Sequence, residues 1–287
     1  MRKNIIRNLI LGASVCVLGA SLASCGSNSV DNSELVIGLE CNYAPFNWTA
    51  TGKNDYTLEI SNVANSYADG YDINFAKRAS KELGINVKIV KMEWDNLIPQ
   101  LNAGQINCII AGMTDTAERR ETIDFTDEYY RSELVLVTSK TVADTYASTT
   151  VDSQTLSTLL NGKGIISQIE TVTNSVIDTF VSNFSAVHMN PVDTFASAAV
   201  QVSSGAAYAM TAEYPVAQSI VKANSNLGII RIDQSILGED KLAELGVSIG
   251  IKKGNTELKD MLNKVLASYT QEERNSDMTA AVERSGE

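Results

Sequence analysis

The chain has 287 residues, which is long enough for two domains, and its formal net charge is −11. A protein this acidic repels nucleic acid and anionic lipid, and because no basic run is present, we exclude nucleic acid as a partner. A single histidine, His188, and four cysteines without a Cys-x-x-Cys pair exclude a His-based zinc site, so we expect no metal and no other cofactor.

The first residues have the pattern of a secretory signal peptide. Three positive charges, from Arg2, Lys3 and Arg7, precede an uncharged apolar run over residues 9–23. The run has about fifteen residues, fewer than the roughly 20 that a membrane-spanning helix needs, so no permanent span is expected. Without residues 1–24 the formal charge becomes −14, and 263 residues remain.

The end of this run resembles the lipobox of bacterial lipoproteins. Residues 22–25 read LASC, and in such proteins the cysteine carries lipid and becomes the mature N-terminus. The resemblance implies a signal peptide over 1–24, lipid (palmitate included) on Cys25, and an extracytoplasmic protein anchored to the cell membrane. The alternative is an ordinary cleavage site followed by an incidental cysteine. The polar residues 26–33 suit a flexible tether.

Short apolar strands then alternate with amphipathic helices, which predicts parallel sheets covered by helices. The strands expected in the first half cover residues 35–39, 85–92, 108–111 and 134–137. A helix is expected over 72–83, with Gly84 as its C-terminal cap. Asp95 is the expected N-cap of a helix through Leu101. The segment 47–70 lacks periodicity and is expected to be a surface excursion.

The alternation restarts after residue 140, which predicts a second lobe rather than an extension of the first. The strands expected here cover 165–168, 187–189, 207–210, 228–232 and 246–251, and the helices cover 153–160, 173–182, 192–203, 215–223 and 255–269. Cys41 and Cys108 are expected at opposite ends of neighbouring parallel strands. Their Cα atoms would then exceed the ~7 Å limit of a disulfide.

Several motifs together carry a resemblance to a known family. The most specific ones are 111–119 (AGMTDTAER), 123–126 (IDFT) and Tyr129-Tyr130, and the supporting ones are 43–46 (YAPF), 70–73 (GYDI) and 97–99 (LIP). In this order they resemble the amino-acid class of bacterial extracellular solute-binding proteins, family 3, over residues 35–269. The resemblance implies an α/β fold of the type II periplasmic-binding-protein kind, with two lobes, each a mostly parallel sheet flanked by helices, and two hinge strands.

The resemblance also implies a function and a division of the chain. The protein would bind a free amino acid by closing two lobes on it and deliver it to the permease subunits of an ABC importer, as a monomer. The implied segments are the signal peptide 1–24, a tether 25–34, the first part of lobe 1 over 35–138, lobe 2 over 139–243, and the return to lobe 1 with a C-terminal helix over 244–287. The crossings between lobes are expected near 137–141 and 241–246.

A free amino acid presents a carboxylate, an ammonium group and a side chain, and burying either charge unpaired costs several kcal/mol. The resemblance assigns the carboxylate to Arg119, whose planar guanidinium can hold both oxygens, and to the amide and hydroxyl of Thr114. It assigns the ammonium group to the carbonyl of Gly112, where no side chain obstructs the approach. The alternative for Arg119 is a solvated surface arginine, as we expect of Arg120.

Three further residues are implied from the second lobe. The segment SQIETV aligns with the family's strand and Gly-Thr loop, which places Thr171 at the carboxylate and Gln168 near the ligand side chain. Glu170 stands where the family usually has glycine, a departure that is expected to alter the backbone of this loop. Glu213 opens a segment, EYPVA, similar to the family's Asp-x-Pro-Val-Ala, whose acid binds the ammonium group. Its alternative role is to cap the following helix.

The ligand side chain is assigned to the acidic Glu40 and to the aromatic Tyr43 and Trp94, which match family positions that flank it. Aromatic rings stack favourably on aliphatic, amide and guanidinium groups, although most aromatics in a domain belong to its core. An acid at this place favours arginine, lysine, histidine or glutamine as the ligand.

Two other functions use the same fold. Arogenate or prephenate dehydratase-like enzymes share it, but the chain has no Gly-x-Ser-x-Gly elbow, no phosphate loop and no Cys/His pair, so we do not expect an enzyme. His188 in its Val-His-Met segment is expected to be packed or exposed, not catalytic. The same module also serves as the input domain of amino-acid sensors. Such a role would need a partner chain, because no transmembrane helix or kinase domain follows Glu287.

Overall fold

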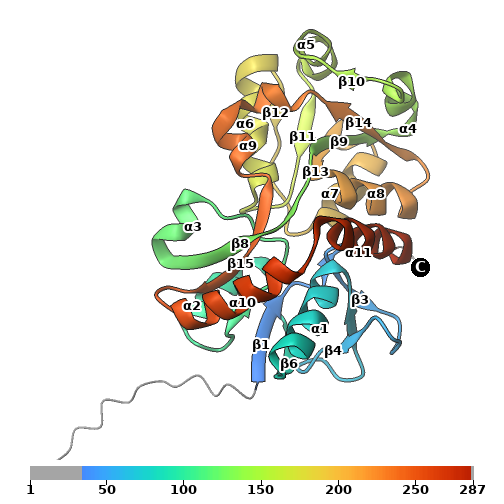
Figure 1. Cartoon of the computed structure of the whole chain (residues 1–287). Helices are drawn as coiled ribbons and strands as arrows, with labels where there is room; N and C mark the ends of the chain where they lie inside the picture. Colours follow the sequence, from blue (N-terminus) through green and yellow to red (C-terminus); the bar gives the residue numbers. More distant parts are fainter. Residues whose placement is uncertain (1–33, 286–287) are drawn as a thin grey trace, which may run out of the picture. The chain divides into compact units, whose positions relative to one another are not determined.

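The computed structural model describes residues 34–285. The predicted signal peptide, Cys25 and the segment 26–33 lie outside these residues. Within them, no helix combines the length and the apolar character that crossing a membrane requires. The described residues form two large sheets flanked by helices and a smaller third sheet (Figure 1).

The first lobe is built on a five-stranded sheet in the order β6-β1-β7-β15-β8. Strand β1 pairs in parallel with β6 and β7, whereas β15 runs antiparallel to β7 and β8. Its strands are β1 (Glu34–Leu39), β6 (Asn86–Lys91), β7 (Cys108–Ile109), β8 (Ile123–Arg131) and β15 (Gly246–Lys252). Its helices are α1 (Tyr71–Leu83), the 3-10 turn η1 (Trp94–Asn96), α2 (Leu97–Asn102), α3 (Ala117–Thr122), α10 (Thr256–Ser268) and α11 (Gln271–Arg284).

The second lobe is built on a six-stranded sheet in the order β10-β14-β9-β13-β11-β12. Only β9 runs antiparallel to its neighbours β13 and β14. Its strands are β9 (Leu134–Ser139), β10 (Thr150–Val151), β11 (Gly164–Ile166), β12 (Val187–His188), β13 (Ala209–Glu213) and β14 (Leu227–Ile232). Its helices are α4 (Lys140–Ala143), η2 (Asp144–Tyr146), α5 (Ser153–Leu160), α6 (Val172–Phe184), α7 (Phe195–Ser203), α8 (Tyr214–Ala223), η3 (Gln234–Leu237) and α9 (Gly238–Ala243).

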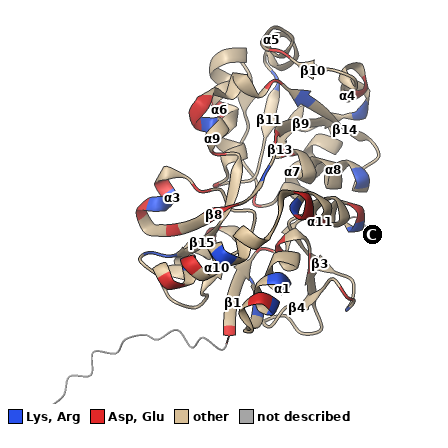
Figure 2. Ribbon diagram, viewed as in Figure 1, with Lys and Arg blue, Asp and Glu red and all other residues tan. Residues whose placement is uncertain are grey.

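Two hydrophobic cores hold these layers together. The larger core fills the first lobe and continues into the second lobe through buried residues of α7 and α8, such as Ala198 and Val216. The smaller core lies beneath α5 and α6. Figure 2 shows charged residues of both signs side by side on α3, α9 and α11.

Helix α1 forms as the hydrophobic spacing predicts. Ile73, Ala76 and Ala79 are buried along one face, and Gly84 ends the helix in the left-handed conformation, with φ 67° and its amide donating to Ser80 O. Glycine adopts this conformation without a steric penalty, which explains the cap. The predicted helix is confirmed.

The first crossing between lobes occurs earlier than predicted. Strand β9 pairs with β13 and β14 over its whole length, so it belongs to the second lobe, and the chain crosses between β8 and β9, at residues 132–133. The predicted boundary at 138/139 and crossing at 137–141 are therefore wrong. An apolar strand has the same sequence pattern whichever sheet it joins, so periodicity cannot place it. The return crossing lies at 244–245, between α9 and β15.

Two features of local structure differ from what the sequence pattern indicates. The segment 47–70 is largely exposed, as expected of a surface excursion, but it is regular: β3 (Asn47–Ala50), β4 (Leu58–Glu59) and β5 (Tyr67–Asp69) join β2 (Asn42–Tyr43) in a four-stranded antiparallel sheet. Strands of two to four residues are too short to show a period. Asp95 lies within η1 and is not a cap, since neither η1 nor α2 has a side-chain cap.

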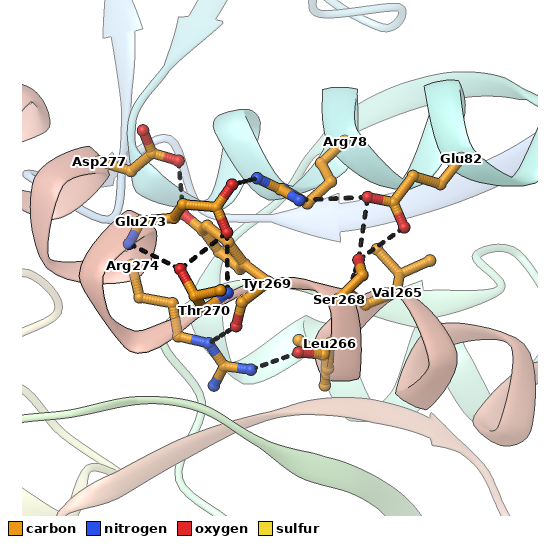
Figure 3. A network of polar contacts seen from close by, with 10 residues as sticks. All are labelled: Arg78, Glu82, Val265, Leu266, Ser268, Tyr269, Thr270, Glu273, Arg274 and Asp277. Atoms are coloured by element: carbon orange, nitrogen blue, oxygen red, sulfur yellow. Dashed lines mark hydrogen bonds and ion pairs between the residues drawn. The ribbon is translucent and has the colours of Figure 1, made fainter.

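Helix α11, which lies beyond the C-terminal helix predicted over 255–269, joins the two lobes. Its capping box of Thr270 and Glu273 starts it, and Arg78 of α1 binds Glu273 at 2.7 Å (Figure 3). At its other end, the buried hydroxyls of Ser285 and Ser219 in α8 lie 2.6 Å apart. Only two of its residues are fully buried, so its amphipathic pattern is weak.

Candidate functional site

All nine residues predicted to bind ligand line one small cavity between the lobes. They are Glu40, Tyr43, Trp94, Gly112, Thr114 and Arg119 from the first lobe and Gln168, Thr171 and Glu213 from the second. Val172 and Phe195, which were not predicted, complete the lining. Both follow N-cap threonines at helix starts, and no sequence signal separates such apolar residues from core residues.

The lobes are closed on the cavity in this conformation, and about 300 Å³ of empty space, part of it open to solvent, remains between its walls. The two lobes touch across it, because Tyr43 of the first lobe stacks on Phe195 of the second with ring centroids 4.9 Å apart. A molecule as large as an amino acid can therefore enter only when the lobes separate.

Arg119 lies on the wall of the cavity, one turn into α3. Its Nη1 donates to Thr114 O and its Nη2 to Glu170 O, both at 2.8 Å, and its guanidinium carbon lies 5.3 Å from the Trp94 ring. Burial lowers the pKa of Arg119 to about 10, so the group is positively charged at neutral pH. Within residues 34–285 no carboxylate forms an ion pair with it. Two neutral carbonyls orient the charge without neutralising it.

Gly112 is required at its position by two independent constraints. Its φ of 61° lies in the left-handed region, which side chains adopt rarely. A Cβ atom there would also lie 2.6 Å from the ring of Tyr43 and 3.2 Å from that of Phe46. The amide of Gly112 donates to the Tyr129 hydroxyl at 2.8 Å. The residue therefore brings bare backbone against the aromatic wall of the cavity.

The loop before α6 keeps the conformation of a glycine despite the glutamate. Glu170 has φ 59°, and its carbonyl accepts from Arg119 and also from Trp94 Nε1 at 3.3 Å, so this one carbonyl links the lobes at the cavity's outer side. Thr171 caps α6 by accepting from the Asn174 amide, and its hydroxyl donates to Gln168 O at 2.7 Å. The first amides of α6 lack helical partners, as at any helix start.

Glu213 brings a carboxylate to the opposite wall. Its Oε2 atom is buried and has no hydrogen-bond partner among the described residues. Burial raises the pKa of Glu213, and the Tyr43 hydroxyl acts in the opposite direction. Glu213 is the N-cap residue of α8, but its side chain makes no capping hydrogen bond. An unpartnered carboxylate oxygen in a closed cavity is costly and needs a donor from elsewhere.

A second carboxylate closes the inner end of the cavity. Glu40 is 3% exposed, and the Nε2 atom of Gln168 from the other lobe donates to its two oxygens at 3.2 and 3.3 Å. Burial raises the pKa of Glu40 to about 7, against the hydrogen bond from Gln168, which lowers it; the charge of Glu93 raises it further and that of Lys91 lowers it. A positive group at this end would pair with the carboxylate.

The only histidine lies outside this site. The ring nitrogens of His188 are 2.8 Å from Asp178 Oδ1 and 3.0 Å from Asn174 Oδ1, and the residue does not line the cavity. The side chain is therefore packed by its own neighbours. Cys41 and Cys108 are both free and buried.

Comparison with known proteins places this site in context. The model of the bacterial extracellular solute-binding proteins, family 3, matches residues 35–280. The arginine-binding extracellular protein ArtP of Bacillus subtilis is 30% identical over 135 residues, 46% of this chain and 48% of that protein. The ABC transporter arginine-binding protein 1 of Escherichia coli is 24% identical over 252 residues, covering 88% of this chain and 91% of the relative.

A solved structure shares the fold. The amino-acid ABC transporter substrate-binding protein AbpA of Streptococcus pneumoniae, bound to L-arginine, matches with a TM-score of 0.71 and 23% identity over 89% of this chain and 97% of the other. The predicted two-lobed α/β fold is thereby confirmed. These relatives are named for binding and not for catalysis, in agreement with the prediction that the chain is not an enzyme.

Proposed function

Because the chain belongs to the bacterial extracellular solute-binding proteins of family 3, we propose that it captures a free amino acid between its lobes and presents it to an ABC importer. One observation carries this proposal. A guanidinium with only neutral partners, Arg119, and a carboxylate oxygen with none, that of Glu213, line the same cavity from opposite lobes. The carboxylate and ammonium groups of a zwitterion complement both.

The ligand carboxylate binds to groups of the first lobe, and donors of the second lobe then complete its hydrogen bonds. The guanidinium of Arg119 takes both oxygens, and the Thr114 amide and hydroxyl add to it. The free amides at the start of α6, beside Thr171, supply further donors as the lobes close. The ammonium group then donates to Glu213 and to the carbonyl of Gly112.

The ligand side chain extends toward the inner end of the cavity. It lies between the rings of Tyr43 and Trp94 and meets Glu40 and Gln168, a carboxylate and an amide. Those groups favour a basic or amide side chain over an acidic or aliphatic one. The names of the two arginine-binding relatives support arginine as the first candidate, ahead of lysine, histidine and glutamine.

Closure follows from differential binding. Ligand contacts both lobes only in the closed conformation, so it shifts the population toward that conformation and raises the melting temperature by mass action. The importer then recognises the closed form. The family's extracellular location agrees with the predicted signal peptide. We further propose that lipid on Cys25 holds a monomer at the membrane, which labelling of wild type and Cys25→Ser with radioactive palmitate tests.

The function is tested by thermal-shift measurements with each of the twenty amino acids, on protein unfolded and dialysed to remove bound ligand. We expect the largest shift with L-arginine or another basic or amide amino acid. Arg119→Ala removes the shift, whereas Arg120→Ala, on the same helix but exposed and paired with Asp115, leaves it intact. A screen without any shift, or an equal shift in Arg119→Ala, would contradict the proposal.

A further inference from the structure

A buried carboxylate that does not itself line the cavity is linked to two segments that do. Asp72, in the first turn of α1, has no exposed surface. Its Oδ1 accepts from the Tyr129 hydroxyl at 2.6 Å, and its Oδ2 accepts from Asn47 Nδ2 at 2.7 Å. No cation lies within ion-pair distance of it among residues 34–285. A carboxylate without a cation is unfavourable in a core, and its hydrogen bonds must offset the cost of burying it.

Each of its two partners also accepts a hydrogen bond from a backbone amide. The Tyr129 hydroxyl accepts from the Gly112 amide at 2.8 Å, and Asn47 Oδ1 accepts from the Cys41 amide at 2.7 Å. Tyr129 and Asn47 have no exposed surface either. One carboxylate thus fixes two amides through two relays, and neither relay reaches solvent.

Both amides belong to residues in the left-handed region, with φ 61° at Gly112 and φ 55° at Cys41. They follow β7 and β1, which pair in parallel, so the two turns lie at the same edge of the sheet. A left-handed cysteine is strained and persists only where its surroundings hold it. Glu40 precedes Cys41 and Tyr43 follows two residues later, so this turn aims both into the cavity.

The geometry points to Asp72 as a positioning residue that holds the Cys41 and Gly112 turns, and with them Glu40, Tyr43 and the Gly112 carbonyl, in the arrangement that binds ligand. The role in binding rests on the proposed function. A carboxylate suits the position because it accepts from two donors at once, whereas an amide would turn its NH2 group toward one of them.

Asp72 also has a plainer explanation. An acid in the first turn of a helix stabilises the helix through the macrodipole. That explanation predicts lower stability in Asp72→Asn, but it predicts no change at the Gly112 or Cys41 amide and no change in affinity. The two explanations therefore differ in measurable properties other than stability.

The test compares Asp72→Asn, Tyr129→Phe, their double variant and Ile73→Val in the whole protein. Ile73 is the next residue of α1, buried and apolar, so Ile73→Val lowers stability without touching the relays. Hydrogen exchange of the two amides is measured together with the Kd for L-arginine by calorimetry. We expect exchange of Gly112 to rise about tenfold in Tyr129→Phe, and that of at least one of the two amides to rise in Asp72→Asn.

We also expect each single variant to raise the Kd about tenfold and the double variant to raise it by less than the product of the two, because both act through one network. Ile73→Val should change neither readout. Unchanged exchange in Asp72→Asn, or an affinity loss no larger than that of Ile73→Val, would overturn the inference. If the wild type binds no amino acid, the proposed function fails, while the exchange of the two amides still decides whether Asp72 holds these turns.

Discussion

Replacing Glu40 by glutamine should stabilise the ligand-free protein in a manner that depends on pH. Burial raises the pKa of this carboxyl from 4.5 to about 7, and each pH unit corresponds to 1.36 kcal/mol. The folded protein therefore binds a proton at Glu40 more tightly than the unfolded chain, and stability falls as pH rises from about 4.5 to 7. Above pH 7 the full penalty, about 3 kcal/mol, weighs on the folded state.

The glutamine side chain has nearly the same shape, can still accept from Gln168, and carries no charge to desolvate. We therefore expect Glu40→Gln to raise the free energy of unfolding by up to about 3 kcal/mol at pH 8 and by almost nothing at pH 4.5. For a chain of this size, each kcal/mol raises Tm by roughly 2–4 °C.

Differential scanning calorimetry of ligand-free protein at both pH values measures this difference. Glu59→Gln, at an exposed position of the same lobe, is the matched control and should change Tm by little at either pH. The reasoning is refuted if Glu40→Gln gives the same Tm difference from wild type at pH 4.5 and pH 8. With basic ligand present, the order reverses, because the variant loses the carboxylate that pairs with the ligand side chain.

Three further substitutions test other parts of the structure. Gly112→Ala should abolish the thermal shift with ligand and lower stability by about 1–3 kcal/mol, because its Cβ would lie 2.6 Å from Tyr43 in a left-handed backbone; an unaltered ligand response would contradict this. Glu170→Gly should preserve affinity and raise the free energy of unfolding, measured by urea denaturation, by up to about 1 kcal/mol. A clearly lower free energy of unfolding would show that the backbone of Glu170 is unstrained. Arg284→Met should destabilise by about 3 kcal/mol, because it leaves the nearly buried Asp69 without its bidentate partner; an unchanged Tm would mean that the ion pair adds nothing.

The residues of the site were predictable because motif order places them at known points of the family's fold. Periodicity could not have found them, since Gly112 and Thr114 are ordinary turn residues by sequence. The features of the site that the sequence could not predict depend on three-dimensional contacts. Phe195 meets Tyr43 only because the lobes close, and Glu170 keeps the backbone of a glycine in a loop whose carbonyl accepts from Arg119 and Trp94 of the other lobe.

The same distinction holds for the fold. Helix α1 has a strong apolar face and a glycine cap, so its limits were predicted closely. Helix α11 buries little and has a polar sequence, and the strands of the small sheet are too short to show a period. The relays from Asp72 are invisible in sequence because their partners stand 25 and 57 residues away.

Calorimetric titration with the best-binding amino acid and two derivatives tests the central claim most directly. One derivative lacks the α-carboxylate, and the other has its α-ammonium group acetylated. Because each leaves Arg119 or Glu213 buried without its partner, we predict that each binds at least about thirtyfold more weakly than the parent amino acid. Binding of either derivative with the affinity of the parent would show that these two residues do not hold the zwitterion.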